Sequence, residues 1–174
     1  HFMKHTTQYV VNGNETMSAL EKTLSSQLHL VGTQVGLSPW VHIDQKTIDR
    51  FAILTKDMQF IHINPKRAAV ETPFGGTVAH GFLTLSFASH FIVEAMAPLP
   101  YAIMNLNSGF DTIRFLNPVL SGSNIRGLFT LKDVTQRSET QLRFVFHMTI
   151  EIEGKDRPAL VADWINTAVF PALE

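Results

Sequence analysis

Asp57 and His62 are the residues whose types and spacing best suit catalysis. They stand five positions apart in a run that is otherwise apolar and includes Met58, Phe60 and Ile61. Apolar surroundings solvate a carboxylate poorly and make it a stronger base when it ionises, and a neighbouring imidazole can keep it ionised. The pair therefore predicts general acid–base chemistry. The structural alternative is that Asp57 caps a turn and His62 is a buried core histidine.

Gly81 and His80 are further candidates, because an apolar helix is expected to begin near them. The first N–H groups of a helix lack partners within it, so the Gly81 amide could bind an oxyanion. Without a side chain, Gly81 would also let a substrate carbonyl approach closely. Its alternative role is tight packing at the start of the helix. His80 is either a second donor to a substrate or a buried structural histidine.

Dinucleotide binding, ATP binding, zinc-protease and serine-hydrolase activity lose support because the sequence lacks their motifs. It contains no GxGxxG, Walker A, HExxH or GxSxG motif. Its eight histidines do not form a ligand motif, since His62, His80 and His90 are separated by 18 and 10 positions, so we expect no bound metal. A net charge of -1 argues against nucleic acid or an acidic membrane surface as a partner.

The cellular setting is also constrained. The chain has no cysteine, which fits a reducing compartment, and its first residues lack the apolar segment of a secretory signal. The most apolar stretch, residues 81–99, contains too many polar residues to span a bilayer. We therefore expect a cytoplasmic protein that is not embedded in a membrane.

The elements that position the candidate residues follow from apolar periodicity. Helices are predicted over 15–30, over 45–55, from Asn64-Pro65 onward, and over 80–97. The helix over 80–97 is apolar nearly all round, so it is expected to be buried. Strands are predicted over 109–116, 125–134, 141–152 and 160–170, at the spacings of an antiparallel meander. A helical first half followed by four strands predicts an α+β hotdog fold, in which an antiparallel sheet wraps around a long central apolar helix.

The length of 174 residues corresponds to one folded domain. Residues 1–3 are interpreted as a cloning remnant, because two residues precede Met3. Residues 4–40 are expected to form an N-terminal helical extension. Residues 41–174 are expected to form the hotdog domain.

Three ordered motifs carry a resemblance to a known family. Residues 56–62, Lys-Asp-Met-Gln-Phe-Ile-His, resemble the pattern Gly-Asp-x-Asn-Pro-x-His of MaoC-like (R)-specific enoyl-CoA hydratases and dehydratases, within the nodulation-protein-N-like branch. Lys56 replaces the glycine, and Gln59-Phe60 replaces Asn-Pro. Residues 73–81, PFGGTVAHG, and 109–119, GFDTIRFLNPV, are the other two motifs. The resemblance covers roughly residues 41–170.

The resemblance implies roles for individual residues. Asp57 and His62 would activate water and handle the proton at the α-carbon, and the amide of Gly81 would contact the thioester oxygen. Ser89 would orient the pair, with Ser86 one turn earlier as the alternative. Arg114 is the candidate for binding the phosphates of coenzyme A or of a carrier-protein pantetheine, with Lys66 and Arg67 as alternatives.

The activity implied is hydration or dehydration of an enoyl or 3-hydroxyacyl thioester, with coenzyme A as part of the substrate and no other cofactor. The carrier would be coenzyme A rather than an acyl-carrier protein. Two alternatives stay open: a thioesterase, and a non-catalytic subunit that binds acyl thioesters or scaffolds an assembly. The departures at Lys56 and Gln59-Phe60 keep the non-catalytic alternative open. Hotdog proteins of this family usually pair edge to edge, so we expect a homodimer or a larger homo-oligomer.

Overall fold

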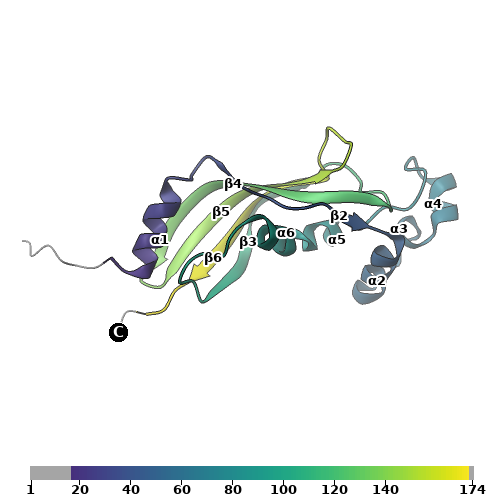
Figure 1. Cartoon of the computed structure of the whole chain (residues 1–174). Helices are drawn as coiled ribbons and strands as arrows, with labels where there is room; N and C mark the ends of the chain where they lie inside the picture. The colour runs from purple at the N-terminus through teal and green to yellow at the C-terminus, as the bar shows by residue number, and fades with distance from the viewer. Residues whose placement is uncertain (1–16, 173–174) are drawn as a thin grey trace, which may run out of the picture.

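The computed structural model describes residues 17–172, and one antiparallel sheet dominates it (Figure 1). The predicted cloning remnant at 1–3 and the start of the first predicted helix lie outside these residues. The sheet order is β1-β4-β5-β6-β3, and β2 also pairs with β4. The strands are β1 (Gln34–Leu37), β2 (Val41–Ile43), β3 (Met104–Phe115), β4 (Ser123–Ser138), β5 (Gln141–Ile152) and β6 (Leu160–Val169).

Six helices complete the described part of the chain. They are α1 (Ala19–Leu28), α2 (Gln45–Thr55), α3 (Phe60–Ile63), α4 (Pro65–Glu71), α5 (Gly81–Ser86) and α6 (Ala88–Ala95). Figure 1 shows α5 and α6 along one face of the sheet, with α2, α3 and α4 gathered at one end and α1 at the other. The Asp44 carboxylate caps α2 by accepting a hydrogen bond from the Thr47 amide. Asn64 caps α4, and Pro65 follows it in the first turn of that helix.

The central helix differs from its prediction in two ways. It is divided at Phe87 into α5 and α6, and only one side of it is covered. Leu83 and Phe91 are buried against the sheet, whereas Phe82 and Val93 are 71% and 72% exposed. The prediction of burial all round is therefore wrong for a single chain, because one sheet covers only one face of a helix. Gly127 on β4 permits the close packing, since a Cβ there would lie 2.7 Å from the Cβ of Phe91.

The strand order also corrects the predicted meander. Strands β4, β5 and β6 are consecutive neighbours as expected, but β3 pairs with β6 at the far edge of the sheet. Alternation along β5 is as predicted, with all six apolar residues of its core face buried: Leu142, Phe144, Phe146, Met148, Ile150 and Ile152. The α+β hotdog architecture is confirmed.

The sheet also includes part of the predicted N-terminal extension. Residues 34–37 form β1, which pairs with β4, so this segment is a strand where a helical extension was expected. The division of the chain at residue 41 stays a prediction. No helix within residues 17–172 is both long and apolar enough to cross a membrane.

Candidate active site

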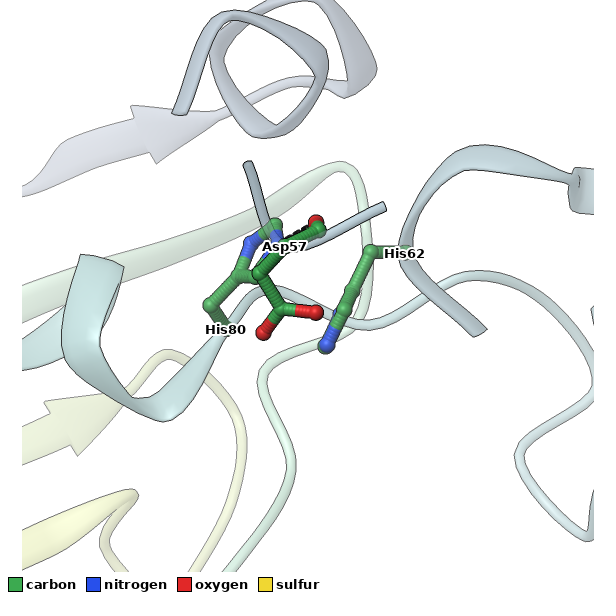
Figure 2. Close-up of side chains that lie close together, drawn as sticks. All are labelled: Asp57, His62 and His80. Atoms are coloured by element: carbon green, nitrogen blue, oxygen red, sulfur yellow. Dashed lines mark hydrogen bonds between the residues drawn. The ribbon is translucent and has the colours of Figure 1, made fainter. Parts of the chain in front are cut away.

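Asp57, His62 and His80 meet at the end of the sheet where α2, α3 and α5 converge (Figure 2). Asp57 follows α2, His62 lies in α3, and His80 directly precedes α5. One side-chain nitrogen or oxygen of each residue lies within 4.8 Å of the other two. Both histidines are buried and Asp57 is half-buried. The structure thus brings the predicted pair together, but the strongest burial falls on the imidazoles rather than on the carboxylate.

The loop that carries Asp57 begins with an unusual backbone conformation. Lys56 ends α2 with φ 63° and ψ 18°, in the left-handed region. Glycine is favoured at such helix ends because it has no Cβ to clash. Lys56 adopts the same region, so its departure from the pattern leaves the turn in place.

Gln45 holds the main chain of His62 by a hydrogen bond, and nothing in the sequence pointed to Gln45. Its Nε2 donates to the backbone oxygen of His62 at 2.7 Å and to Asp49 Oδ1 at 2.8 Å. Its Oε1 accepts a hydrogen bond from the Thr77 hydroxyl. Gln45 therefore ties α2, α3 and the segment before α5 together around the site.

His62 is held in one tautomer by its surroundings. Its Nδ1 lies 2.6 Å from the Val78 carbonyl oxygen, which can only accept a hydrogen bond, so Nδ1 carries the proton. Nε2 of the neutral ring is then free to accept. Burial lowers the pKa of His62, and nearby His80 lowers it further, against the opposing effects of the Val78 hydrogen bond and Asp57. His62 is consequently neutral, and able to take up a proton, at neutral pH.

His80 uses its hydrogen-bonding capacity within the protein. Its Nε2 lies 3.0 Å from the backbone oxygen of Asp57, and its ring stacks on His62 with centroids 3.7 Å apart. Its Nδ1 is buried and has no partner within residues 17–172. His80 was predicted to be either a donor to a substrate or a buried structural histidine. In the structure its Nε2–H group donates to the main chain of Asp57.

The three side chains have the composition of a metal site but not the directions of one. The planes of the His62 and His80 rings are inclined by only 22°. A histidine ligand directs its lone pair in the ring plane, with zinc about 2.0–2.1 Å from the nitrogen. The lone pairs of two stacked rings, with centroids 3.7 Å apart, do not converge on one such point. The arrangement favours proton transfer, and the absence of a metal stays a prediction.

Gly81 begins α5 and lines a cavity with Thr84, Phe115, Pro118 and other residues. Its N–H, like the first N–H groups of any helix, has no partner within the helix. A Cβ added to Gly81 would lie 3.0 Å from two carbons of the Phe115 ring. This close contact gives the packing role direct support, and it places an added methyl against Phe115 rather than in open space.

Three other predicted site residues lie elsewhere. Ser89 is exposed on α6, and its hydroxyl accepts a long hydrogen bond, 3.4 Å, from Asn107 Nδ2. Ser86 instead donates to the Leu83 carbonyl one turn earlier in its own helix. Arg114 is exposed on β3. Its neighbour Ile113 packs against the core and its neighbour Phe115 packs against α5, so alternation directs Arg114 to the opposite face of the sheet. The structure does not bring these side chains to Asp57 and His62.

The two basic residues of α4, Lys66 and Arg67, were the alternatives to Arg114 for binding phosphate. Arg67 forms an ion pair with Glu71 at 3.0 Å and lies over the ring of Phe60, 3.9 Å from its centroid. Lys66 is exposed. Arg67 is thus committed to its own helix and to the segment that carries His62.

The fold agrees with what comparison with known proteins finds. Residues 26–146 match the family described as "MaoC like domain", so this chain belongs to the MaoC-like dehydratase family. The family resemblance predicted from the three motifs is confirmed.

Two curated relatives and one solved structure are similar to most of this chain. The chain is 46% identical over 150 residues to nodulation protein N of Rhizobium leguminosarum bv. viciae, covering 86% of this chain and 93% of that protein. It is 37% identical over 134 residues to 3-hydroxyacyl-thioester dehydratase Z of Mycobacterium tuberculosis, covering 77% and 87% respectively. Among solved structures, the (R)-hydratase from A. caviae superposes with a TM-score of 0.64 at 20% identity, covering 81% of this chain and 96% of the other. The structural likeness supports the shared fold.

Proposed function

We propose that this protein adds water to, or removes it from, the 2,3 bond of an enoyl or 3-hydroxyacyl thioester. The observation that carries the proposal is the pairing of the Asp57 carboxylate with a buried neutral imidazole whose Nε2 has no hydrogen-bond partner among residues 17–172. Membership of the MaoC-like dehydratase family supports the reaction class, and the relative named 3-hydroxyacyl-thioester dehydratase Z supports the substrate class.

In hydration, Asp57 and His62 would share the handling of one water molecule. The pair takes a proton from the water as its oxygen bonds to carbon 3, and a proton is delivered to carbon 2. Charge that develops on the thioester oxygen would be stabilised by the Gly81 amide. Dehydration follows the same steps in reverse. No redox or metal cofactor enters this scheme, and coenzyme A takes part only as the carrier of the acyl group.

The proposal includes a compartment and a carrier. A chain without cysteine suits the reducing cytoplasm. We favour coenzyme A over an acyl-carrier protein as the carrier. Crotonyl groups on each carrier, assayed side by side, distinguish the two by their kcat/KM values.

The test of the proposed activity uses crotonyl-CoA. We expect the enoyl absorbance to fall without release of free thiol, because water adds to carbon 3 and the thioester bond survives. Release of thiol would instead identify a thioesterase. Binding of the thioester with neither change would identify a non-catalytic acyl-thioester-binding protein.

The proposal also includes a homodimer formed through β3 and the outer side of α5 and α6. Strand β3 pairs only with β6, so its other backbone edge lacks a strand partner within the described residues. Apolar side chains are exposed along this edge and on the helices beside it: Phe82, Val93, Met104, Leu106 and Phe110. An exposed apolar edge strand invites pairing, and antiparallel pairing with a second copy closes the assembly.

Sedimentation velocity at micromolar concentration checks this interface. We expect the parent protein to sediment as a dimer or larger and the Val93→Arg variant as a monomer, because the substitution places a charge on the apolar contact surface. Val70→Arg is the matched control, since Val70 is 85% exposed on α4, away from β3. A monomeric parent, or a Val93→Arg variant that sediments like the control, would contradict the proposed interface.

A further inference from the structure

We infer that His80 is a positioning residue, which sets the Asp57 carboxylate relative to His62 without contacting the substrate. The inference rests on the proposed function and adds to the Asp57 and His62 pair a third residue that acts through them. Three observations carry it: the hydrogen bond from His80 to the main chain of Asp57, the stacking of its ring on His62, and the isolation of its remaining nitrogen.

The hydrogen bond fixes the loop that carries the carboxylate. The Asp57 oxygen that His80 binds is a backbone carbonyl, which can only accept, so His80 Nε2 is the donor. Asp57 follows α2 directly after Lys56, and within residues 17–172 its carboxylate has no hydrogen bond or ion pair of its own. The bond from His80 therefore holds the residue through its main chain and leaves both carboxylate oxygens available for chemistry.

The ring of His80 supports His62 from the side. The two ring centroids lie 3.7 Å apart, and Phe51 of α2 lies 5.1 Å from the His80 ring. Figure 2 shows the Asp57 carboxylate pointing towards the His62 ring while the Asp57 carbonyl is bound by His80. One side chain thus contacts both members of the pair, and a change in its position would move them relative to each other.

The unbound nitrogen explains why this residue does not serve as a donor to substrate. His80 is 3% exposed, and with the proton on Nε2 its Nδ1 is a bare acceptor enclosed by protein. A thioester oxygen needs a donor, which Nδ1 in this tautomer cannot provide. The Nε2–H is already bound to Asp57.

Two substitutions separate the two contacts. His80→Gln retains an amide donor at the position of Nε2 but removes the stacked ring, and His80→Phe retains the ring but removes the donor. We expect each variant to lower kcat for crotonyl-CoA hydration by about 10- to 100-fold, as expected when a reacting group is displaced. KM should change by less than about threefold, because no contact with the substrate is lost. The same changes at His29, which is exposed at the end of α1, are the controls and should leave both constants unchanged.

A KM that rises while kcat is retained in either His80 variant would show that His80 binds the substrate and would overturn the inference. Unchanged kcat in both variants would overturn it as well. If the parent protein lacks hydratase activity, the proposed function fails, and the arrangement around His80 is still tested on the parent protein by the measurement that follows.

Nitrogen-15 NMR of the histidine rings in the unmodified protein needs neither activity nor a folded variant. We expect His80 to carry its proton on Nε2 and His62 on Nδ1, both with slow solvent exchange, because both rings are buried and each proton is bound to a backbone carbonyl. A His80 ring protonated on Nδ1 alone would break the bond to Asp57 and refute the inference.

A pH titration of the His80→Gln variant is a separate measurement. There the pKa of His62 should rise, since the loss of the stacked ring exposes His62 to water.

Discussion

Asp57→Asn is expected to lower the rate of crotonyl-CoA hydration by about 10²–10⁴-fold, the usual cost of removing a positioned general base. The amide has nearly the shape of the carboxylate but cannot take up a proton from water. The backbone oxygen of Asp57, which His80 binds, is not altered by the substitution. The fold should therefore persist, and the rate measured by loss of enoyl absorbance should report basicity alone.

Asp156→Asn is the control for this substitution. Asp156 is exposed in the loop between β5 and β6, far along the chain from the site residues. Its substitution makes the same chemical change as Asp57→Asn. We expect it to match the parent in rate and in melting temperature. Asp57→Asn activity within a few-fold of the parent would remove Asp57 from the catalytic pair, provided the melting temperature shows that both variants are folded.

His62→Asn is expected to produce a loss of similar size, about 10²–10⁴-fold in kcat/KM. Asparagine can place its Nδ2 donor where His62 Nδ1 bonds the Val78 carbonyl, so the substitution keeps that bond and removes the free Nε2. In the parent, the acid limb of the pH–rate profile should lie below the ordinary histidine range. The pKa of His62 is lowered, so the ring stays neutral, and able to accept a proton, until the pH falls below its reduced value.

Combining Asp57→Asn with His62→Asn tests whether the two side chains serve one step. We expect the double variant to lose much less than the product of the two single losses, because residues that act as a unit are strongly non-additive. Steady-state kinetics of the four proteins provide the comparison. Losses that multiply would assign the two residues to separate steps and would contradict the proposed shared handling of water.

Apolar periodicity in the sequence was sufficient for the long elements. Strand β5 and helix α2 have the predicted bounds, and the hotdog architecture follows from the order of helices and strands. Strands β1 and β2 were missed because four and three residues are too short to show a period. The place of β3 beside β6 was missed because the pairing of distant strands depends on the path of the chain between them.

The site was predictable in part. Spacing and family resemblance pointed to Asp57 and His62, and the structure brings them together. Ser89 and Arg114 lie elsewhere because the direction of a side chain depends on local geometry that residue type does not encode. The central helix is interrupted at Phe87, and β3 contains two irregularities before residue 113. Each of these alters which residues face the site.

The sequence by itself determined the family to which the chain belongs, and it predicted the proposed reacting groups, a carboxylate and an imidazole five residues apart. Only the tertiary structure decided which nitrogen of each histidine is free. The backbone oxygens of Val78 and Asp57 fix the tautomers of His62 and His80 respectively. Gln45 binds the backbone oxygen of His62. Every residue has a backbone carbonyl, so the contact is set by where the folded main chain passes and leaves no mark in the sequence.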